Sequence, residues 1–406
     1  MKNSTKKFNL GPIVILLFIL APTISIPFIL IEIYNKKKYP LLLLAIYMGL
    51  LSMFYYPWGD QYRYLNYIET YRHLNFNELF DFSKVLIFRD LNCVNLFLFI
   101  AAKSGFSLEL FRFSLVVISY ILIFDIFNDF DKDSNSIIIS YNKRFIIFLY
   151  LYLSVPFYHI CYGFRTGLAI CLFAYGVYKL ETNKQNGYAF ILLSCLTHYF
   201  FLAESIIYLI STKLRRNISK RNIVMIGGIL IVILFFTLNY IYGKNAFIDI
   251  IIDTYINGEH GIESNKSIKD IFSTLLLNGI LVIALYVIFL TYNYNNRLSN
   301  LLYLNLCILI ISIPLPTINE RFLAISVILI ILYFYITNKH ILINKRIILL
   351  PLLIISLIYP YWKHRDIYAL TKIEEIIYKP LPLIIQHQVD IDEVNKYINS
   401  DGEYIK

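Results

Sequence analysis

A carboxylate, a guanidinium and a row of tyrosines follow an apolar run with the spacing of one helical face. The segment reads Pro57-Trp58-Gly59-Asp60-Gln61-Tyr62-Arg63-Tyr64, and its proline suits the first turn of a helix. On that helix, Asp60, Arg63 and Tyr64 share a face that continues through Tyr67 and Tyr71. The face is suited to line a sugar-binding groove. For the tyrosines we favour a simpler interpretation, an aromatic belt on an amphipathic helix at a membrane interface.

Arg165 lies between two apolar runs, in the segment His159-Ile160-Cys161-Tyr162-Gly163-Phe164-Arg165-Thr166-Gly167-Leu168. An arginine at membrane depth costs on the order of 2.5–3.5 kcal/mol, so such residues usually face a cavity or a partner. A guanidinium presents a planar fork that suits phosphate. We therefore favour a phosphate-binding role for Arg165 over snorkelling of the side chain at a helix end.

His198 lies within an apolar run, in Leu196-Thr197-His198-Tyr199-Phe200. A histidine there can exchange a proton near neutral pH. The alternative is a structural histidine that only satisfies a hydrogen bond. Glu204 follows in the same run but is not on the same helical face.

Glu320 and Arg321 follow the segment Pro314-Leu315-Pro316-Thr317-Ile318-Asn319 at the start of a further apolar run. Thr317 and Glu320 have the spacing of a capping box, which is a structural explanation for Glu320. A cation in a first helical turn opposes the helix dipole. Arg321 is therefore expected to be compensated by an anion, either Glu320 or a ligand.

The elements that position these residues are membrane helices. The composition is 58% hydrophobic and 16% charged, with a mean hydropathy of +0.62. Soluble domains average about 45–50% apolar and about 25% charged residues, so a soluble protein, a disordered chain and a coiled coil are excluded. The net charge of +10 comes from short basic clusters between apolar runs. Such clusters are typical of membrane topology signals and do not indicate nucleic-acid binding.

Apolar runs long enough to cross a bilayer predict an all-α, polytopic membrane protein with about 10–12 transmembrane helices and a long exported loop. We predict spans over residues 10–33, 40–56, 108–128, 145–162, 166–180, 188–211, 223–242, 271–291, 299–315, 322–338 and 347–361. Residues 1–361 form the predicted membrane domain, and residues 362–406 form an amphipathic charged tail.

The basic clusters at residues 36–38, 143–144, 213–221 and 345–346 indicate cytoplasmic loops. The long segments 57–90 and 243–270 are interpreted as exported. If Arg165 faces outward and residues 188–211 form one span, the cluster at 213–221 falls on the exported side. A break near His198 would remove this conflict.

Several familiar motifs are absent from the sequence. It contains no P-loop, GxGxxG, GxSxG or HExxH motif, and its five cysteines form no CxxC pair. Nucleotide-driven transport, a zinc peptidase and a metal site are therefore unsupported. His260 stands between Glu259 and Glu263 without a zinc-binding spacing, so we interpret it as solvated surface.

At the singled-out positions the chain resembles the Wzy-type O-antigen polymerases and the EpsG-type exopolysaccharide polymerases. The matching stretches are Gly59-Asp60-x-x-x-Tyr64, Arg165 followed by Thr166-Gly167-Leu168-Ala169, His198 at the end of an apolar run, and Glu320-Arg321. Thr166 stands where the family often has glutamine. Arg89-Asp90-Leu91 stands where the family has an acidic-proline pair, which weakens any role for Asp90.

The resemblance implies a metal-independent glycosyltransferase without a cofactor, in many passes through the bacterial inner membrane. It would join undecaprenyl-pyrophosphate-linked repeat units on the exported side, for O-antigen of lipopolysaccharide, capsule or exopolysaccharide. Arg165 and Arg321 would neutralise the pyrophosphate, and Asp60 or His198 would accept the proton of the acceptor hydroxyl. Arg63, Tyr64 and Glu320 would bind substrate. The resemblance also implies two partners, a chain-length regulator and a repeat-unit flippase.

Two other functions remain open from the residues. A membrane glycosyltransferase with a lipid-monophosphate donor usually has an acidic pair in its first exported loop, whereas Asp60 is followed by Gln61. A flippase for lipid-linked oligosaccharide would more often show internal repeats, and none is visible in this sequence.

Overall fold

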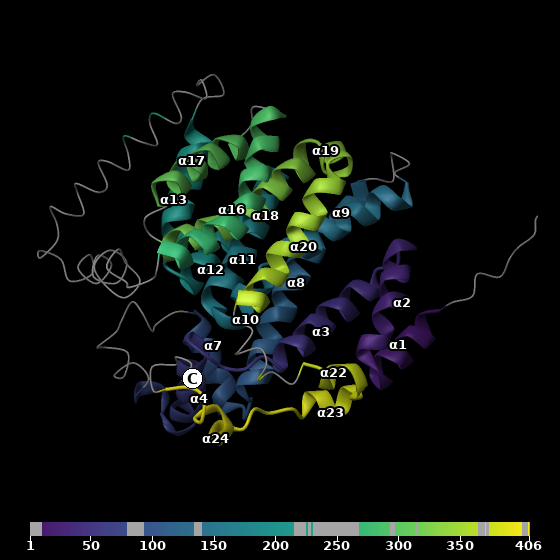
Figure 1. Cartoon of the computed structure of the whole chain (residues 1–406), viewed down its shortest axis with the longest axis vertical. Coiled ribbons are helices and arrows are strands. Elements are labelled where there is room, and N and C mark those ends of the chain that lie inside the picture. The colour runs from purple at the N-terminus through teal and green to yellow at the C-terminus, as the bar shows by residue number, and fades with distance from the viewer. Residues whose placement is uncertain are drawn as a thin grey trace, which may run out of the picture. The chain divides into compact units, whose positions relative to one another are not determined.

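The apolar runs form α-helices throughout the described part of the chain (Figure 1). A computed structural model describes residues 10–78, 93–133, 140–214, 225, 229, 268–292, 297–312, 316–363, 370, 373–399 and 405. Within these ranges the secondary structure is helical and contains no β-strand. The prediction of an all-α membrane protein is confirmed. The predicted span 223–242, Asp90 and His260 lie outside the described residues.

The chain divides into two compact units, which are described separately. The first unit comprises residues 1–148, 155–171 and 360–406. Its helices are α1 (Gly11–Leu20), α2 (Pro22–Tyr34), α3 (Tyr39–Met53), α4 (Asp60–His73), α7 (Cys93–Lys103), α8 (Leu108–Asp133), most of α9 (Tyr141–Ser154), α10 (Phe157–Tyr162), the first part of α11 (Phe164–Glu181), α22 (Glu375–Tyr378), α23 (Leu381–Ile385) and α24 (Ile391–Val394). Helix α3 packs along α8, and α4 packs against α7.

The second unit comprises residues 149–154 and 172–359. It holds the rest of α11, α12 (Gly187–Thr197), α13 (Phe200–Lys213), α16 (Ile268–Thr291), α17 (Arg297–Ile311), α18 (Pro316–Thr337), α19 (Lys339–Asn344) and most of α20 (Arg346–Lys363). Helix α17 packs against both α13 and α18, and α16 packs against α18.

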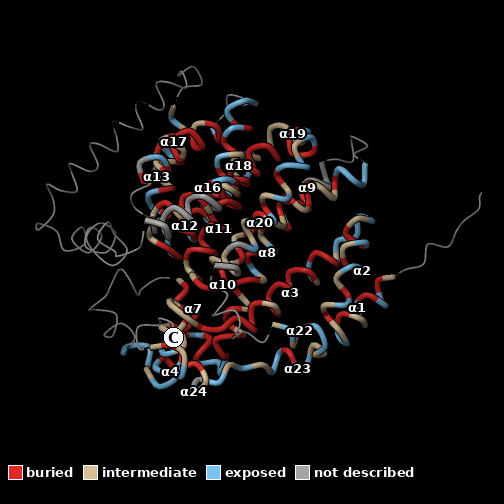
Figure 2. Tube along the Cα trace, in the orientation of Figure 1, coloured by how far each residue is buried: buried red, intermediate tan, exposed pale blue. Residues whose placement is uncertain are grey.

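Three stretches of the described chain are long and apolar enough to cross a membrane: Leu108–Asp129, Tyr141–Tyr162 and Ile318–Thr337. A further eight apolar helices of 10–17 residues are present among the described residues. Figure 2 shows that many apolar helices expose one side. Leu16, Leu192 and Ile283 are 57%, 59% and 64% exposed, as expected where the surrounding medium is lipid.

Three predicted spans are each broken into two helices. The stretch 145–162 breaks at the extended Val155 and at Pro156, between α9 and α10. The stretch 10–33 breaks at Ala21, which is extended (φ −154°, ψ 83°) before Pro22 begins α2. The reason is steric, because the proline ring disfavours the helical conformation of the preceding residue. The prediction of one continuous helix over 10–33 is therefore wrong. The stretch 188–211 breaks at His198, which is also extended (φ −150°, ψ 117°). A helix break near His198, which would remove the conflict over the side of the basic cluster 213–221, is therefore present.

Candidate functional site

The acidic end of α4 is set by a glycine turn. Gly59 precedes the helix with φ +59°, a conformation that L side chains rarely adopt. Helix α4 therefore begins at Asp60 and not at Pro57, as the proline had suggested. Asp60 occupies the first helical position, where the dipole favours a carboxylate. It forms an ion pair with Arg63 one turn later, and the two side chains are 39% and 40% exposed.

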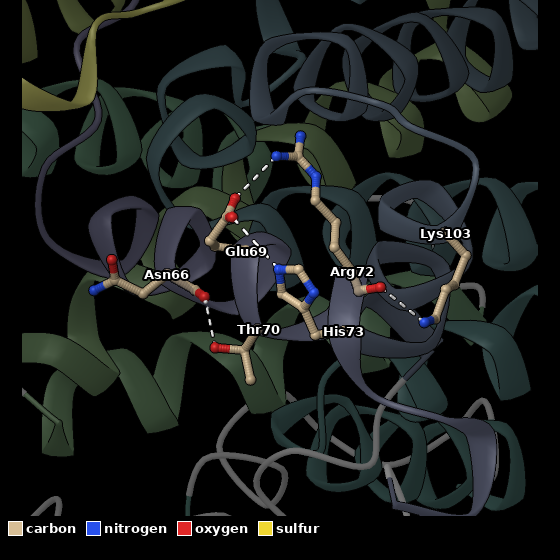
Figure 3. A network of polar contacts seen from close by, with 6 residues as sticks. All are labelled: Asn66, Glu69, Thr70, Arg72, His73 and Lys103. Carbon is tan, nitrogen blue, oxygen red and sulfur yellow. Dashed lines mark hydrogen bonds and ion pairs between the residues drawn. The ribbon is translucent and has the colours of Figure 1, made fainter.

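The far end of α4 is held by charges on α4 itself and by α7 (Figure 3). Glu69 forms an ion pair with Arg72 at 2.9 Å. The ammonium group of Lys103, on α7, donates to the backbone carbonyl of Arg72 at 2.9 Å. A cation at this carbonyl satisfies a backbone group that the end of a helix leaves without a partner. Helix α4 is thus fixed in direction at the end opposite to Asp60.

Tyr64 connects α4 to the helix that carries Arg165. Its ring lies 5.0 Å from that of Phe164 and is 4% exposed. Burial raises the pKa of the Tyr64 phenol to about 12, and the neighbouring Arg165 acts in the opposite direction. Tyr71 is 1% exposed and packs against Phe99. The interpretation of these two tyrosines as a membrane belt is wrong, because protein side chains cover them.

Arg165 is the second residue of α11 and is half-buried. Its position depends on the close approach of α10 to α11. A side chain at Gly167 would lie 2.5 Å from the Cα atom of Ile160, well inside van der Waals contact. Only glycine allows this approach. Arg165 therefore stands in the first turn of a helix that starts directly beside Tyr64.

Arg112 is a buried cation in the same unit that sequence reasoning missed. Its side chain is 0% exposed, and its Nη1 atom donates to the backbone carbonyl of Tyr55 at 2.6 Å. Its Nε and Nη2 atoms form no hydrogen bond within the described residues. Cys161 and Tyr162 lie beside the guanidinium. Arg112 thus anchors the chain that leads from α3 to Asp60. Like Arg165, it is an arginine at the edge of an apolar run, and the same argument applied to 108–128 would have found it.

Aromatic rings surround the turn between α3 and α4. Trp58 lies 5.4 Å from Tyr162 and Tyr55 lies 5.5 Å from Tyr162, measured between ring centroids. Trp58 itself is only half-buried. Trp58 precedes Asp60 by two residues, so these rings line the approach of the chain to the start of α4.

In the second unit, His198 holds the start of α13. Its Nδ1 atom accepts a hydrogen bond from the backbone N–H of Phe200 at 3.1 Å, and the residue is 4% exposed. An imidazole that accepts through Nδ1 carries its proton on Nε2 when neutral. His198 is therefore a hydrogen-bond donor at Nε2, which favours the structural alternative over a proton acceptor.

Arg321 lies near this helix start. Its guanidinium carbon is 5.9 Å from the centroid of the Phe200 ring, within range of a cation–π contact. Helix α18 begins at Pro316, so Arg321 is in its second turn and Thr317 is already inside the helix. The predicted capping position of Thr317 and first-turn position of Arg321 are both wrong. Glu320 is half-buried.

The sequence matches the EpsG family over residues 41–371. The chain belongs to the EpsG family. This family consists of Wzy-type exopolysaccharide polymerases, so the resemblance seen in the sequence is confirmed. No curated protein and no solved structure matches the chain.

The EpsG match includes every predicted site residue and leaves residues 372–406 outside. The first unit of this EpsG protein brings together Asp60, Arg63, Tyr64 and Arg165. In the second unit, Phe200 contacts both His198 and Arg321, and Glu320 precedes Arg321 in the sequence. The chain is therefore a membrane-embedded protein of a polysaccharide-polymerase family, with a charged and aromatic cluster in its first unit.

Proposed function

We propose that this protein joins oligosaccharide repeat units that are carried on a polyprenyl pyrophosphate, at the exported face of the bacterial inner membrane. The observation that carries the proposal is the meeting of α4 with the first turn of α11. There the Asp60–Arg63 pair, the Tyr64 ring and Arg165 belong to one cluster. It combines a proton acceptor with a cation for an anionic leaving group, and the partly exposed Trp58 precedes Asp60 by two residues.

In the proposed reaction, the acceptor hydroxyl oxygen attacks the anomeric carbon of the donor sugar. The bond from that carbon to the pyrophosphate oxygen breaks, and its electron pair leaves with the pyrophosphate. Arg165 stabilises the negative charge that develops on the leaving group, as preorganised donors do in a site that excludes water. The hydroxyl proton passes to the base. Protein cations supply the charge neutralisation, so the proposed reaction requires no metal ion.

We assign the base to Asp60 in preference to His198. The carboxylate of Asp60 is partly exposed and is held by Arg63 at the first position of α4. An ionised carboxylate offers only acceptor atoms. The Nδ1 atom of His198, in contrast, already accepts the N–H of Phe200. Arg63 then orients the carboxylate and Trp58 contacts the sugars, while the buried Tyr64 holds α4 against the start of α11.

A strain that lacks the gene tests the proposal, complemented with wild type or with single variants. Surface polysaccharide is separated on a gel. Wild type is expected to restore a ladder of polymer lengths, and Asp60→Asn is expected to leave single repeat units on the surface. Glu69→Gln is the matched control, because Glu69 forms the same kind of ion pair on the same helix, with Arg72. Removing a general base typically costs about 10²–10⁴-fold in rate.

Other outcomes would decide against the proposal. If the deleted strain accumulates repeat units on lipid inside the cell, the protein is needed for export and a flippase is favoured. If polymer formation is unchanged by the deletion, the protein is not the polymerase. If Asp60→Asn and Glu69→Gln give the same ladder at equal protein levels, Asp60 is not the base.

A further inference from the structure

The C-terminal segment packs onto the turn that carries the proposed base. We call residues 54–62 the α3–α4 turn and residues 387–398 the C-terminal strap. Tyr56, Val394 and Ile398 form one buried cluster, in which Val394 is 0% exposed. Trp58 and Tyr62 pack against the same cluster. The strap therefore touches the turn both before and after Gly59.

Hydrogen bonds reinforce this apolar contact. The Tyr56 hydroxyl donates to the backbone carbonyl of Glu393 at 3.0 Å. The Tyr62 hydroxyl donates to the side-chain oxygen of Asn395 at 2.9 Å. Tyr62 lies between Asp60 and Arg63 in the sequence, so the strap is bonded to the same helical turn as the ion pair.

The strap is held at its other end by the membrane helices of the first unit. The ring of His387 stacks on Phe54 with centroids 4.4 Å apart. The backbone N–H of Val389 donates to the carboxylate of Glu109 on α8 at 3.2 Å. Glu109 lies beside Arg112, which binds the carbonyl of Tyr55. The α3–α4 turn is thus contacted by both the strap and α8.

We propose that the C-terminal strap is part of the functional site and positions Asp60. This inference rests on the proposed function. Val394 and Asn395 are positioning residues, since they act through Tyr56, Trp58 and Tyr62 and not on the substrate. Because residues 372–406 lie outside the EpsG match, the strap is an element of this chain that the shared family region does not supply.

A consequence concerns membrane topology. Because the strap contacts the α3–α4 turn, both lie on the same side of the membrane. The chain between Tyr62 and His387 therefore crosses the membrane an even number of times. If Asp60 works at the exported face, the C-terminus is exported too.

The contact is tested without reference to activity by photo-crosslinking. Benzoylphenylalanine replaces Tyr62 in the full-length protein, in native membranes. Irradiation is expected to join position 62 to a peptide within residues 387–398, identified by mass spectrometry.

A second measurement compares Asn66→Cys and Gln386→Cys, both exposed, in a background with the native cysteines replaced. A membrane-impermeant maleimide is expected to label both positions in spheroplasts. Labelling of only one of them would overturn the inference.

The positioning role is tested by a pair of aspartate substitutions in the same tail. Val394→Asp places a charge in the cluster against Tyr56, whereas Tyr378→Asp changes a side chain that is 66% exposed on α22. At equal membrane levels, Val394→Asp is expected to reduce polymer at least tenfold and to abolish the crosslink from position 62. Tyr378→Asp is expected to retain both. Val394→Ile, which keeps a branched apolar side chain, is expected to retain both polymer formation and the crosslink from position 62.

The outcomes separate this inference from the proposed function. If deletion of the gene abolishes the ladder but Val394→Asp and a chain ending at residue 371 still form it, the strap has no positioning role and the polymerase proposal stands. If the crosslink forms as expected but deletion leaves the ladder intact, the strap contact is real and the polymerase proposal fails. If Val394→Asp is absent from the membrane, Asn395→Ala, which removes only the bond to Tyr62, is measured instead and is expected to reduce polymer.

Discussion

The Nδ1 atom of His198 accepts the backbone N–H of Phe200 at 3.1 Å. This bond lies where the predicted span 188–211 breaks into α12 and α13. It satisfies one of the backbone donors that the start of a helix leaves open. His198, one residue before the N-cap Tyr199, therefore supports the start of α13 in the manner of a capping side chain.

The capping role predicts how His198 responds to substitution. His198→Asn supplies a side-chain oxygen acceptor and is expected to retain both stability and polymer formation. His198→Leu removes the acceptor and is expected to destabilise the protein by about 1 kcal/mol, as for other lost caps. Thermal unfolding in detergent and the polysaccharide ladder measure the two effects. A large loss of polymer in His198→Asn, with stability unchanged, would instead assign His198 to the chemistry.

Arg165 is predicted to need its planar fork as well as its charge. Arg165→Ala is expected to reduce polymer formation on the order of 100-fold, as for other lost electrostatic donors. Arg165→Lys keeps the charge but not two parallel donors, so it is expected to restore activity only in part. Quantified ladders at equal membrane levels measure both. Full activity of Arg165→Ala would remove this residue from the proposed mechanism.

Gly167 is predicted to be intolerant of the smallest substitution. In Gly167→Ala the new methyl group would collide with the backbone of Ile160, so α10 and α11 must separate. We expect a lower unfolding temperature and loss of polymer. Gly279→Ala is the matched control, because nothing lies within 4 Å of the added atom. Replacing that helical glycine is expected to be neutral or to stabilise by up to about 1 kcal/mol. Equal behaviour of the two variants would contradict the close helix contact.

Tyr64 is predicted to make stability depend on pH in the alkaline range. Burial raises its pKa to about 12 in the folded protein, whereas an exposed tyrosine titrates near 10. The folded state thus holds the phenol proton more tightly, and this contribution is complete below pH ~10 and is lost as the pH rises towards 12. The unfolding temperature of wild type is expected to fall more steeply over this range than that of Tyr64→Phe. The control Tyr378→Phe, at an exposed position, should follow wild type.

Spacing along the chain predicted much of the local structure correctly. Asp60, Arg63 and Tyr64 lie on one face of α4 because that relation depends only on the helical period. The apolar runs became helices for the same local reason, and the break at His198 is the one that the basic clusters had raised as an alternative to a single span over 188–211. The break at Pro22 was missed although its cause, a proline after Ala21, is equally local.

Contacts between distant segments were not predictable in this way. The Arg112 bond to Tyr55 joins residues 57 positions apart, and the Tyr62 bond to Asn395 joins residues 333 positions apart. Neither segment carries a periodic signal that names its partner. The burial of Tyr64 was also misjudged, because the helical face is the same whether lipid or Phe164 covers it.

The sequence by itself determined that this is an all-α membrane protein of the EpsG family, and it determined which residues share a helical face. Hydropathy and helical period are properties of neighbouring residues, so they can be read along the chain. Only the tertiary structure decided that Arg112 and the C-terminal strap hold the turn before Asp60, and that a close contact at Gly167 holds the helix of Arg165. These relations arise when separate segments pack together to bury apolar surface and satisfy buried polar groups.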